Sequence, residues 1–233
     1  MSKDASNTGW VSRLAGRFIA FEGADGCGKS TQLKRLVALC EAAGLRVCLV
    51  REPGGTHVGE RVRQILLDKA SEGMTLRCEM LLYMASRAQL VEMVVRPALA
   101  RGELVIADRF LASTYSYQGA AGGLPADEIA AAARIAVGAT MPELNLVYDV
   151  DEETAAKRAG IVTTAKGSKR GDAGVSLFAD RMEDKDRAFR KKVRDGYLEQ
   201  AAREPAAFAV IDARGDAEMV WGLTLAALAG RYG

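Results

Sequence analysis

The sequence has little histidine or cysteine for metal centres and disulfide frameworks, and it lacks the long apolar runs of membrane spans. Its 233 residues include one histidine, His57, and no continuous apolar run long enough to cross a membrane. None of the four cysteines lies in a CxxC pair or at metal-binding spacing from a histidine, so we expect free thiols in reducing surroundings. These cysteines are Cys27, Cys40, Cys48 and Cys78.

Neither sign of charge is in excess. The 32 basic and 30 acidic residues give a formal net charge of +2, so we expect no broad binding to nucleic acid or to a membrane surface. No low-complexity linker or internal repeat divides the chain, which favours one domain over residues 17–233. Residues 1–16 carry Lys3 and Arg13 but lack the apolar core of a signal peptide, and we expect them to be a poorly ordered extension.

Apolar runs alternate with segments of helical periodicity from Arg17 to the end of the chain. This alternation predicts an α/β fold, with a mainly parallel five-stranded sheet and helices on both faces. In such sheets the ligand lies at the carboxyl ends of the strands. The predicted strands are Phe18–Phe21, Arg46–Val50, Leu104–Ala107, Leu144–Val150 and Ala207–Ile211.

Two other segments have distinct patterns. Residues Leu76–Arg101 have helical periodicity, and Pro97 is expected to kink or restart that helix. Residues 160–174 combine glycine and Ser/Thr with Lys166, Lys169 and Arg170, and we expect a mobile basic lid over about residues 158–181. An ordinary solvated loop is the alternative for this segment.

The stretch from Gly23 to Ser30 fits the P-loop pattern, a glycine-flanked loop closed by Lys-Ser. A predicted strand precedes it and a predicted helix follows it, as the motif requires, and this context disfavours a simple turn. Its backbone N–H groups would surround phosphates, Lys29 would reach the outer phosphates, and the Ser30 hydroxyl would bind Mg²⁺. The sequence thus predicts a P-loop NTPase fold that handles ATP.

Two further motifs follow predicted strands. Arg51 opens the turn Arg51-Glu52-Pro53-Gly54-Gly55-Thr56, and its guanidinium could hold a second phosphate or lie on the surface. Asp108 and Arg109 end the strand Leu104–Ala107. A carboxylate at that position is suited to Mg²⁺, although Asp108 could instead cap the next helix.

These motifs, together with the segments 81–89 and 108–119, resemble the thymidylate kinase family from Arg17 to near Gly233. The resemblance implies the reaction ATP + dTMP → ADP + dTDP, a step in dTTP synthesis, with ATP-Mg²⁺ as donor. It also implies a homodimer. The lack of a signal-peptide pattern in residues 1–16 leads us to expect a cytoplasmic protein. The stretch Leu90–Val95 could supply the dimer face, or could equally pack inside the domain.

The resemblance also implies a role for individual residues. The expected ATP-binding residues are Gly23, Ala24, Asp25, Gly26, Cys27, Gly28, Lys29, Ser30, Thr31 and Ala213. The expected dTMP-binding residues are Asp25, Arg51, Tyr83, Arg87, Arg109, Thr114, Tyr117 and Gln118, with Tyr83 stacking on thymine and Tyr117 disfavouring a ribose 2′-hydroxyl. The expected metal-binding residues are Ser30, Asp108 and Asp25. The expected catalytic residues are Lys29, Arg109, Arg51, Arg181 and Arg158.

The chain departs from the family in one respect, because Ala24, Asp25 and Cys27 place no basic residue at the variable P-loop positions. The missing cation would then come from the lid, which offers Arg158, Lys166, Lys169, Arg170 and Arg181. Two other functions remain open. One is a kinase for dUMP, dCMP or a deoxynucleoside, the last with Glu22 or Asp25 as base; the other is a non-catalytic nucleotide switch. His57 is expected at the surface or at a helix start, without a general-base role.

Overall fold

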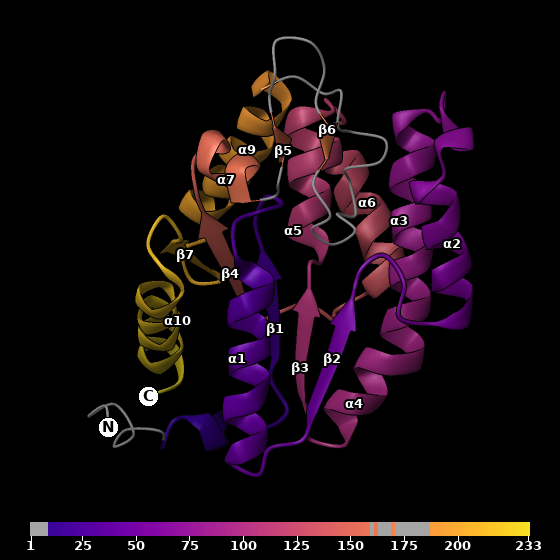
Figure 1. The fold of residues 1–233 in the computed structure, drawn as a ribbon. Helices are drawn as coiled ribbons and strands as arrows, with labels where there is room; N and C mark the ends of the chain where they lie inside the picture. The colour runs from indigo at the N-terminus through magenta and orange to yellow at the C-terminus, as the bar shows by residue number, and fades with distance from the viewer. Residues whose placement is uncertain (1–8, 159–160, 163–168, 171–186) are drawn as a thin grey trace.

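A computed structural model describes residues 9–158, 161–162, 169–170 and 187–233 (Figure 1). Five parallel strands form one sheet in the order β2-β3-β1-β4-β7, which confirms the predicted fold class. The strands are β1 (Phe18–Glu22), β2 (Val47–Arg51), β3 (Leu104–Asp108), β4 (Leu144–Asp149) and β7 (Phe208–Asp212). Each lies within two residues of its predicted bounds.

The alternation of side chains along β1 explains why helices cover both faces of the sheet (Figure 1). Ile19 and Phe21 pack in one core with residues of α1 (Lys29–Ala42) and α10 (Ala217–Tyr232). Phe18 and Ala20 pack in a second core with residues of α3 (Leu76–Leu90) and α6 (Ala126–Val137). Both sets are fully or almost fully buried, as expected for a strand covered on both sides.

The predicted interruption at Pro97 takes the form of a π-helical turn, η4 (Val91–Val95), which joins α3 to α4 (Arg96–Ala100). Proline has no N–H to donate, so the helical hydrogen-bond pattern must change before it. Leu90, Val91 and Val95 are fully buried in the second core. Most of the apolar side chains of Leu90–Val95 therefore pack inside the domain, and Met93 is the one that is largely exposed.

The N-terminal prediction is wrong for residues 9–16. A short 3-10 helix, η2 (Val11–Leu14), places Val11 and Leu14 in the first core beside Trp10. Arg13 donates from Nη1 to the carbonyl oxygen of Tyr232 at 3.1 Å, which ties this segment to α10. The side chains of Trp10, Val11 and Leu14 thus anchor residues 9–16 to the domain core.

The remaining helices lie mostly at the carboxyl-end side of the sheet or beside it (Figure 1). They are α2 (His57–Leu67), η3 (Lys69–Ser71), α5 (Leu111–Thr114), the π-helical η5 (Tyr115–Ala121), α7 (Glu152–Arg158) and α9 (Arg187–Arg203). His57 is exposed and is the first residue of α2, as predicted. Within the described ranges, no helix has the length and apolar character needed to span a bilayer.

Only short parts of the predicted lid are described. Strands β5 (Ile161–Val162) and β6 (Lys169–Arg170) pair in an antiparallel ladder, and α7 ends at Arg158. Lys166 and Arg181 lie outside the described residues.

Candidate active site

Glycines shape the loop between β1 and α1. Gly23, Gly26 and Gly28 have φ angles of 133°, 79° and 90°, a region that other residues rarely enter. A Cβ atom at Gly23 would lie 2.6 Å from the carbonyl oxygen of Tyr148, so the loop can lie against β4 only with glycine there. Gly28 caps the 14-residue helix α1, whose first N–H groups face a prospective phosphate site.

Asp25 of this loop lies between two cations from different motifs. Its Oδ1 accepts a hydrogen bond from Nη2 of Arg109 at 2.6 Å, and Nζ of Lys29 lies 3.9 Å from the same oxygen. Lys29 and Arg109 are both buried. The structure therefore brings together the predicted phosphate-binding lysine and the predicted acceptor-side arginine around one carboxylate.

The backbone of Arg109 has a φ of 70°, the one positive φ among the described residues other than glycine. Hydrogen bonds on both sides of the turn hold this conformation. The Arg109 N–H donates to the Phe21 carbonyl oxygen at 2.9 Å, and the Phe110 N–H donates to Oε1 of Glu22 at 2.7 Å. A strained residue fixed in this way is typical of functional sites.

Glu22 is the centre of a buried polar network. Its Oε2 accepts hydrogen bonds from the Ser113 hydroxyl at 2.7 Å and from the Tyr197 hydroxyl at 3.3 Å. Nη1 of Arg109 lies 3.2 Å from the Ser113 Oγ and 3.1 Å from the Tyr197 hydroxyl, to which it donates. Burial raises the pKa of Glu22, against the lowering effects of Ser113 and Arg109. The network fixes the direction of the Arg109 side chain.

Arg51 and Asp108 are paired residues at the ends of β2 and β3. Nη2 of Arg51 donates to Oε1 of Glu60 at 3.0 Å, and this side chain is about half exposed. Oδ1 of Asp108 is buried and has no hydrogen-bond partner among the described residues. Such an orphaned acceptor at a strand end suits a cation or a water bound to one.

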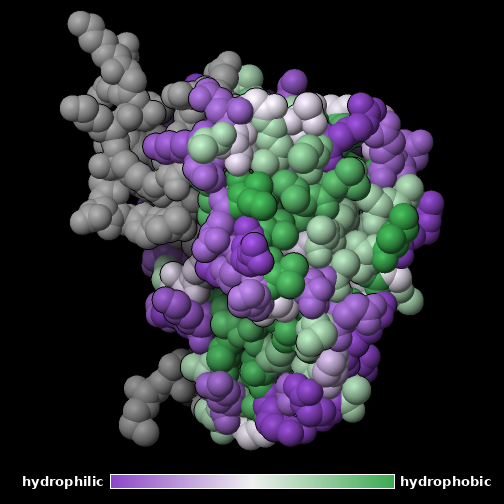
Figure 2. All heavy atoms as spheres, turned by 90° about the vertical axis from the view of Figure 1, so that its right-hand side faces the viewer, coloured by the Kyte–Doolittle hydropathy of each residue, from purple (hydrophilic) through white to green (hydrophobic). Residues whose placement is uncertain are grey.

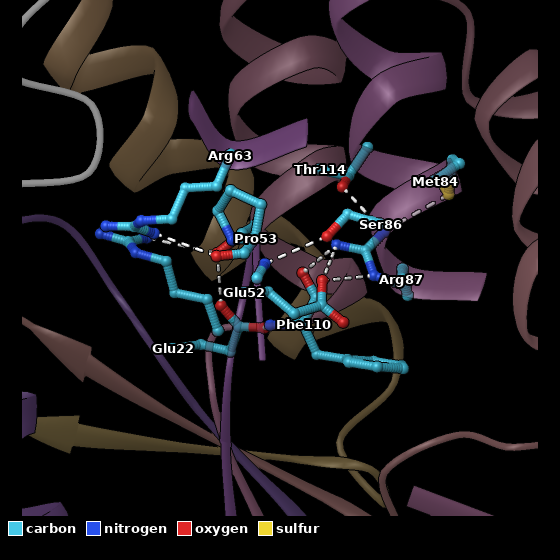
Figure 3. Close-up of polar contacts among 12 residues, drawn as sticks. Glu22, Glu52, Pro53, Arg63, Met84, Ser86, Arg87, Phe110 and Thr114 are labelled. Atoms are coloured by element: carbon cyan, nitrogen blue, oxygen red, sulfur yellow. Dashed lines mark hydrogen bonds and ion pairs between the residues drawn. The ribbon is translucent and has the colours of Figure 1, made fainter. Parts of the chain in front are cut away.

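Arg87 lies deeper, in a fully buried cluster (Figure 3). Nε donates to Oε2 of Glu52 at 2.6 Å, Nη1 donates to Oγ1 of Thr114 at 3.1 Å, and Nη2 donates to the Phe110 carbonyl oxygen at 3.2 Å. Burial raises the pKa of Glu52 to about 7, although Arg87 acts in the opposite direction. The structure thus brings the predicted base contacts Arg87 and Thr114 together.

The loop after β2 is held by the helices beside this cluster (Figure 3). Ser86 Oγ accepts from the Gly54 N–H at 3.0 Å, and Nη1 of Arg63 donates to the Pro53 carbonyl oxygen at 3.0 Å. Thr56 caps α2 by accepting the Gly59 N–H at 2.9 Å. These contacts position the turn that carries Arg51.

The other predicted dTMP contacts are also buried close to this wall. Tyr83 and Tyr117 belong to one apolar cluster with Tyr197. The guanidinium carbon of Arg109 lies 5.3 Å from the centre of the Tyr117 ring. Gln118 donates from Nε2 to Oε1 of Glu79 at 2.8 Å. Residues from α3 and η5 therefore face each other beside Arg109.

Ala213 directly follows β7, the edge strand opposite β2, and its N–H donates to the Asp149 carbonyl oxygen at 2.8 Å. Arg158 donates to the carbonyl oxygens of Ala213, Arg214 and Gly215 at 2.6, 2.9 and 3.0 Å. The structure therefore places Arg158 on the turn predicted to contact adenine, with its guanidinium engaged there rather than at Asp25 or Lys29.

Several residues of this site were not among the residues predicted for a dTMP kinase, although Glu22 was named as a candidate base for a deoxynucleoside acceptor. Glu22, Glu52, Ser113 and Tyr197 hold the predicted arginines in place but act through partners distant in sequence. The one usable signal was the position of Glu22 at the end of an otherwise apolar strand, where an acid needs a partner. Tyr197 gave no such signal, because an aromatic residue on a helix is typical of a core.

The sheet order, the glycine loop opening on a buried lysine and the second set of cations define a P-loop enzyme that transfers phosphoryl groups between nucleotides. Comparison with known proteins specifies the family. The model of the thymidylate kinase family matches residues 21–221, so the chain belongs to that family. It is an ATP-dependent nucleoside monophosphate kinase.

Individual relatives agree with this assignment. The chain is 42% identical to the thymidylate kinase of Desulfosudis oleivorans over 211 residues, which cover 91% of this chain and 95% of that protein. It is 44% identical to the thymidylate kinase of Pseudomonas syringae pv. tomato, over 86% of this chain and 89% of the relative. The crystal structure of thymidylate kinase from Ehrlichia chaffeensis is similar with a TM-score of 0.69 and 29% identity, covering 91% of this chain and 98% of that one.

Proposed function

We propose that this site transfers the γ-phosphoryl group of ATP to dTMP, giving ADP and dTDP. One observation carries the proposal: Lys29 of the P-loop and Arg109 of the β3 end converge on the carboxylate of Asp25, at 3.9 and 2.6 Å. A donor-phosphate site and an acceptor-phosphate site therefore adjoin. Membership of the thymidylate kinase family supports dTMP as the acceptor.

The barrier to this reaction is mainly electrostatic and orientational, because two polyanions must be brought into line. Residues 23–31 would bind the ATP phosphates, and the Ala213 turn, held by Arg158, would contact adenine. Arg109 and Arg51 would hold the dTMP phosphate, while Tyr83, Arg87, Thr114 and Gln118 surround the base. Tyr117 would lie under the sugar. Arg181 and the lid of residues 158–181 would add positive charge and exclude water, within a catalytic domain of residues 17–233.

The residues present fit a magnesium ion. Mg²⁺ in phosphoryl-transfer sites takes few protein ligands and binds largely to phosphates and water. Among the described residues no cluster of three acidic, histidine or cysteine ligands occurs, but the orphaned Oδ1 of Asp108 and the Ser30 hydroxyl at the start of α1 suit such a site. We propose that Ser30, Asp108 and Asp25 hold it. When bound, the ion would neutralise charge on the transferring phosphates.

The contacts of two acids disfavour a deoxynucleoside acceptor, which would need a base for its hydroxyl. Glu22 is engaged by the Phe110 N–H and by the Ser113 and Tyr197 hydroxyls, and Asp25 pairs with Arg109. A non-catalytic switch would need no second cluster of buried cations. The arrangement therefore supports a monophosphate acceptor.

A panel of monophosphates with ATP-Mg²⁺ tests the proposal, with ADP release as the measurement. We expect turnover that depends on dTMP and exceeds that with dCMP or UMP. ATP hydrolysis without dependence on any monophosphate would contradict it, and a higher rate with another acceptor would replace dTMP as the substrate.

We also propose a homodimer in the cytoplasm. Large apolar side chains are exposed on the side of the molecule formed by α2, α3 and α6, and Figure 2 shows a broad apolar area on this side. They include Val58, Ile65, Leu81, Met93 and Ile135, the last 89% exposed. An exposed apolar area of this kind is typical of a subunit interface. Sedimentation at equilibrium should give twice the 24.9 kDa chain mass.

A further inference from the structure

Glu79 lies on the same face of α3 as two predicted contacts to the base. Residues Glu79, Tyr83 and Arg87 are spaced by four, so their side chains follow one another along one side of the helix. All three are buried. An acid in such a position is costly unless it is paired, and it therefore needs a reason to be there.

One partner of Glu79 is the amide of Gln118. Nε2 of Gln118 donates to Oε1 of Glu79 at 2.8 Å, and the Gln118 side chain is 1% exposed. A carboxylate offers only acceptor oxygens, so the amide cannot be reversed without placing two oxygens against each other. Oε1 of Gln118 accepts no hydrogen bond from the described residues, and Nε2 keeps a second N–H.

We propose that Glu79 is a positioning residue that determines which pyrimidine base the site accepts. By fixing the amide of Gln118, it presents an acceptor and a donor side by side. Thymine and uracil offer the complementary pair, the N3–H donor and the O4 acceptor. Cytosine offers N3 as acceptor and its 4-amino group as donor, and would need the reversed amide. Glu79 thus selects 4-oxo over 4-amino pyrimidines and does not distinguish thymine from uracil. This inference rests on the proposed function.

The contacts of Arg87 add to the same selection. All of its protein partners are acceptors, because a guanidinium has only N–H donors, and Thr114 and Glu52 fix its orientation. Such a group favours a carbonyl oxygen over an amino group on the base. Unlike Arg87, an amide can turn by 180° and present either pattern, so it is the group that requires a fixed acidic neighbour.

The variant Glu79→Gln tests the inference, because a glutamine at position 79 can pair with either orientation of the Gln118 amide. The dissociation constants of dTMP, dUMP and dCMP are measured by displacement of labelled dTMP from the full chain. We expect the ratio of the dCMP constant to the dTMP constant to fall about tenfold, the size of one hydrogen-bond preference. The ratio of dUMP to dTMP should not change. Glu128→Gln is the matched control, since Glu128 pairs with Arg77 of α3 at the surface and its loss should leave both ratios as they are.

A second variant keeps the inference falsifiable if Glu79→Gln does not fold. Gln118→Met removes the amide and keeps the length of the side chain, and it should lower the dCMP-to-dTMP ratio by a similar factor. Adding Glu79→Gln to it should then have no further effect on the ratio. An unchanged ratio in either single variant, or equal weakening of all three nucleotides, would overturn the role of Glu79. A wild-type chain that binds no pyrimidine monophosphate would instead overturn the proposed function.

Discussion

The donor half and the acceptor half of the site are built in different ways. The P-loop is one continuous stretch, and its shape comes from backbone angles at Gly23, Gly26 and Gly28. The acceptor half is built from buried side chains of α3, α5, η5 and α9, which lie far apart in the sequence. The first half depends on local conformation, whereas the second depends on the whole fold.

This difference also concerns charge. The donor half presents N–H groups and Lys29 to a phosphate, and its one acid, Asp25, pairs with Arg109 of the acceptor half and lies 3.9 Å from Lys29. In the acceptor half, buried Glu52 pairs with Arg87 and buried Glu79 accepts a hydrogen bond from Gln118. Buried Glu22 is linked to Arg109 through the Ser113 hydroxyl. Buried pairs of this kind hold side chains in fixed directions, but removing one partner leaves the other buried without a hydrogen bond or counter-charge, which destabilises the fold.

The largest expected effect comes from a substitution that disrupts only the donor half. Lys29→Ala should lower kcat at least about a hundredfold, because the lysine would stabilise charge on the transferring phosphoryl group. The fold should survive, since Asp25 keeps its hydrogen bond to Arg109. Turnover is measured by ADP release and folding by circular dichroism. Lys34→Ala is the control, because Lys34 is exposed on the same helix and should not affect kcat. Near-normal turnover in Lys29→Ala would remove the donor role from residues 23–30.

The next effect concerns the charge buried in the acceptor half and is seen in stability against pH. The folded state raises the pKa of Glu52 from 4.5 to about 7, so between these values the folded protein binds more protons than the unfolded chain. Stability should therefore fall as pH rises through this window and level off above it. Relative to Glu52→Gln, the wild type should lose about 3 kcal/mol, at about 1.4 kcal/mol for each pKa unit.

Urea unfolding at several pH values from 4.5 to 8 measures this difference. Glu60→Gln provides a contrast of opposite sign when the series is extended down to about pH 3, because the Gly55 N–H and Arg51 lower the pKa of Glu60 from 4.5 and its contribution is lost only as pH falls below that value. A difference between wild type and Glu52→Gln that does not change with pH would show that Glu52 stays ionised throughout, and that its pairing with Arg87 outweighs burial.

The comparison also explains what could be predicted from the sequence. The five strands and the P-loop were predicted because each has a local pattern, an apolar run or a fixed glycine spacing. The π-helical form of the turn before Pro97 could not be predicted, since a missing N–H can also end a helix or kink it. Trp10, Val11 and Leu14 were misjudged because a short apolar segment packs only where a partner surface, here α10 and the sheet, exists.

The acceptor half was predicted only as far as the resemblance reached. The resemblance pointed to Arg87, Thr114 and Arg109 as substrate contacts, but not to the acids that orient them, because Glu52 and Glu22 meet their arginines across 35 and 87 residues of sequence. At Arg158, by contrast, the sequence suggested a contact that differs from the one in the structure. The basic character of this residue suggested a phosphate contact, yet the end of α7 lies against the Ala213 turn, and only the packed structure places it there.

The smallest expected effect is that of Tyr197→Phe, which tests whether binding of dTMP can be weakened without weakening binding of ATP. Tyr197→Phe removes one hydroxyl that contacts Glu22, Ser113 and Arg109 and keeps the ring in its apolar cluster. Arg109 keeps its other contacts, so kcat/KM for dTMP should fall about threefold to tenfold, the cost of one buried hydrogen bond, while KM for ATP stays constant. Tyr148→Phe is matched to it, because its buried hydroxyl contacts Thr224 on the other face of the sheet and should leave dTMP kinetics unchanged. An equal rise in KM for ATP and dTMP in Tyr197→Phe would mean that the halves act as one unit, since α9 would then position both nucleotides.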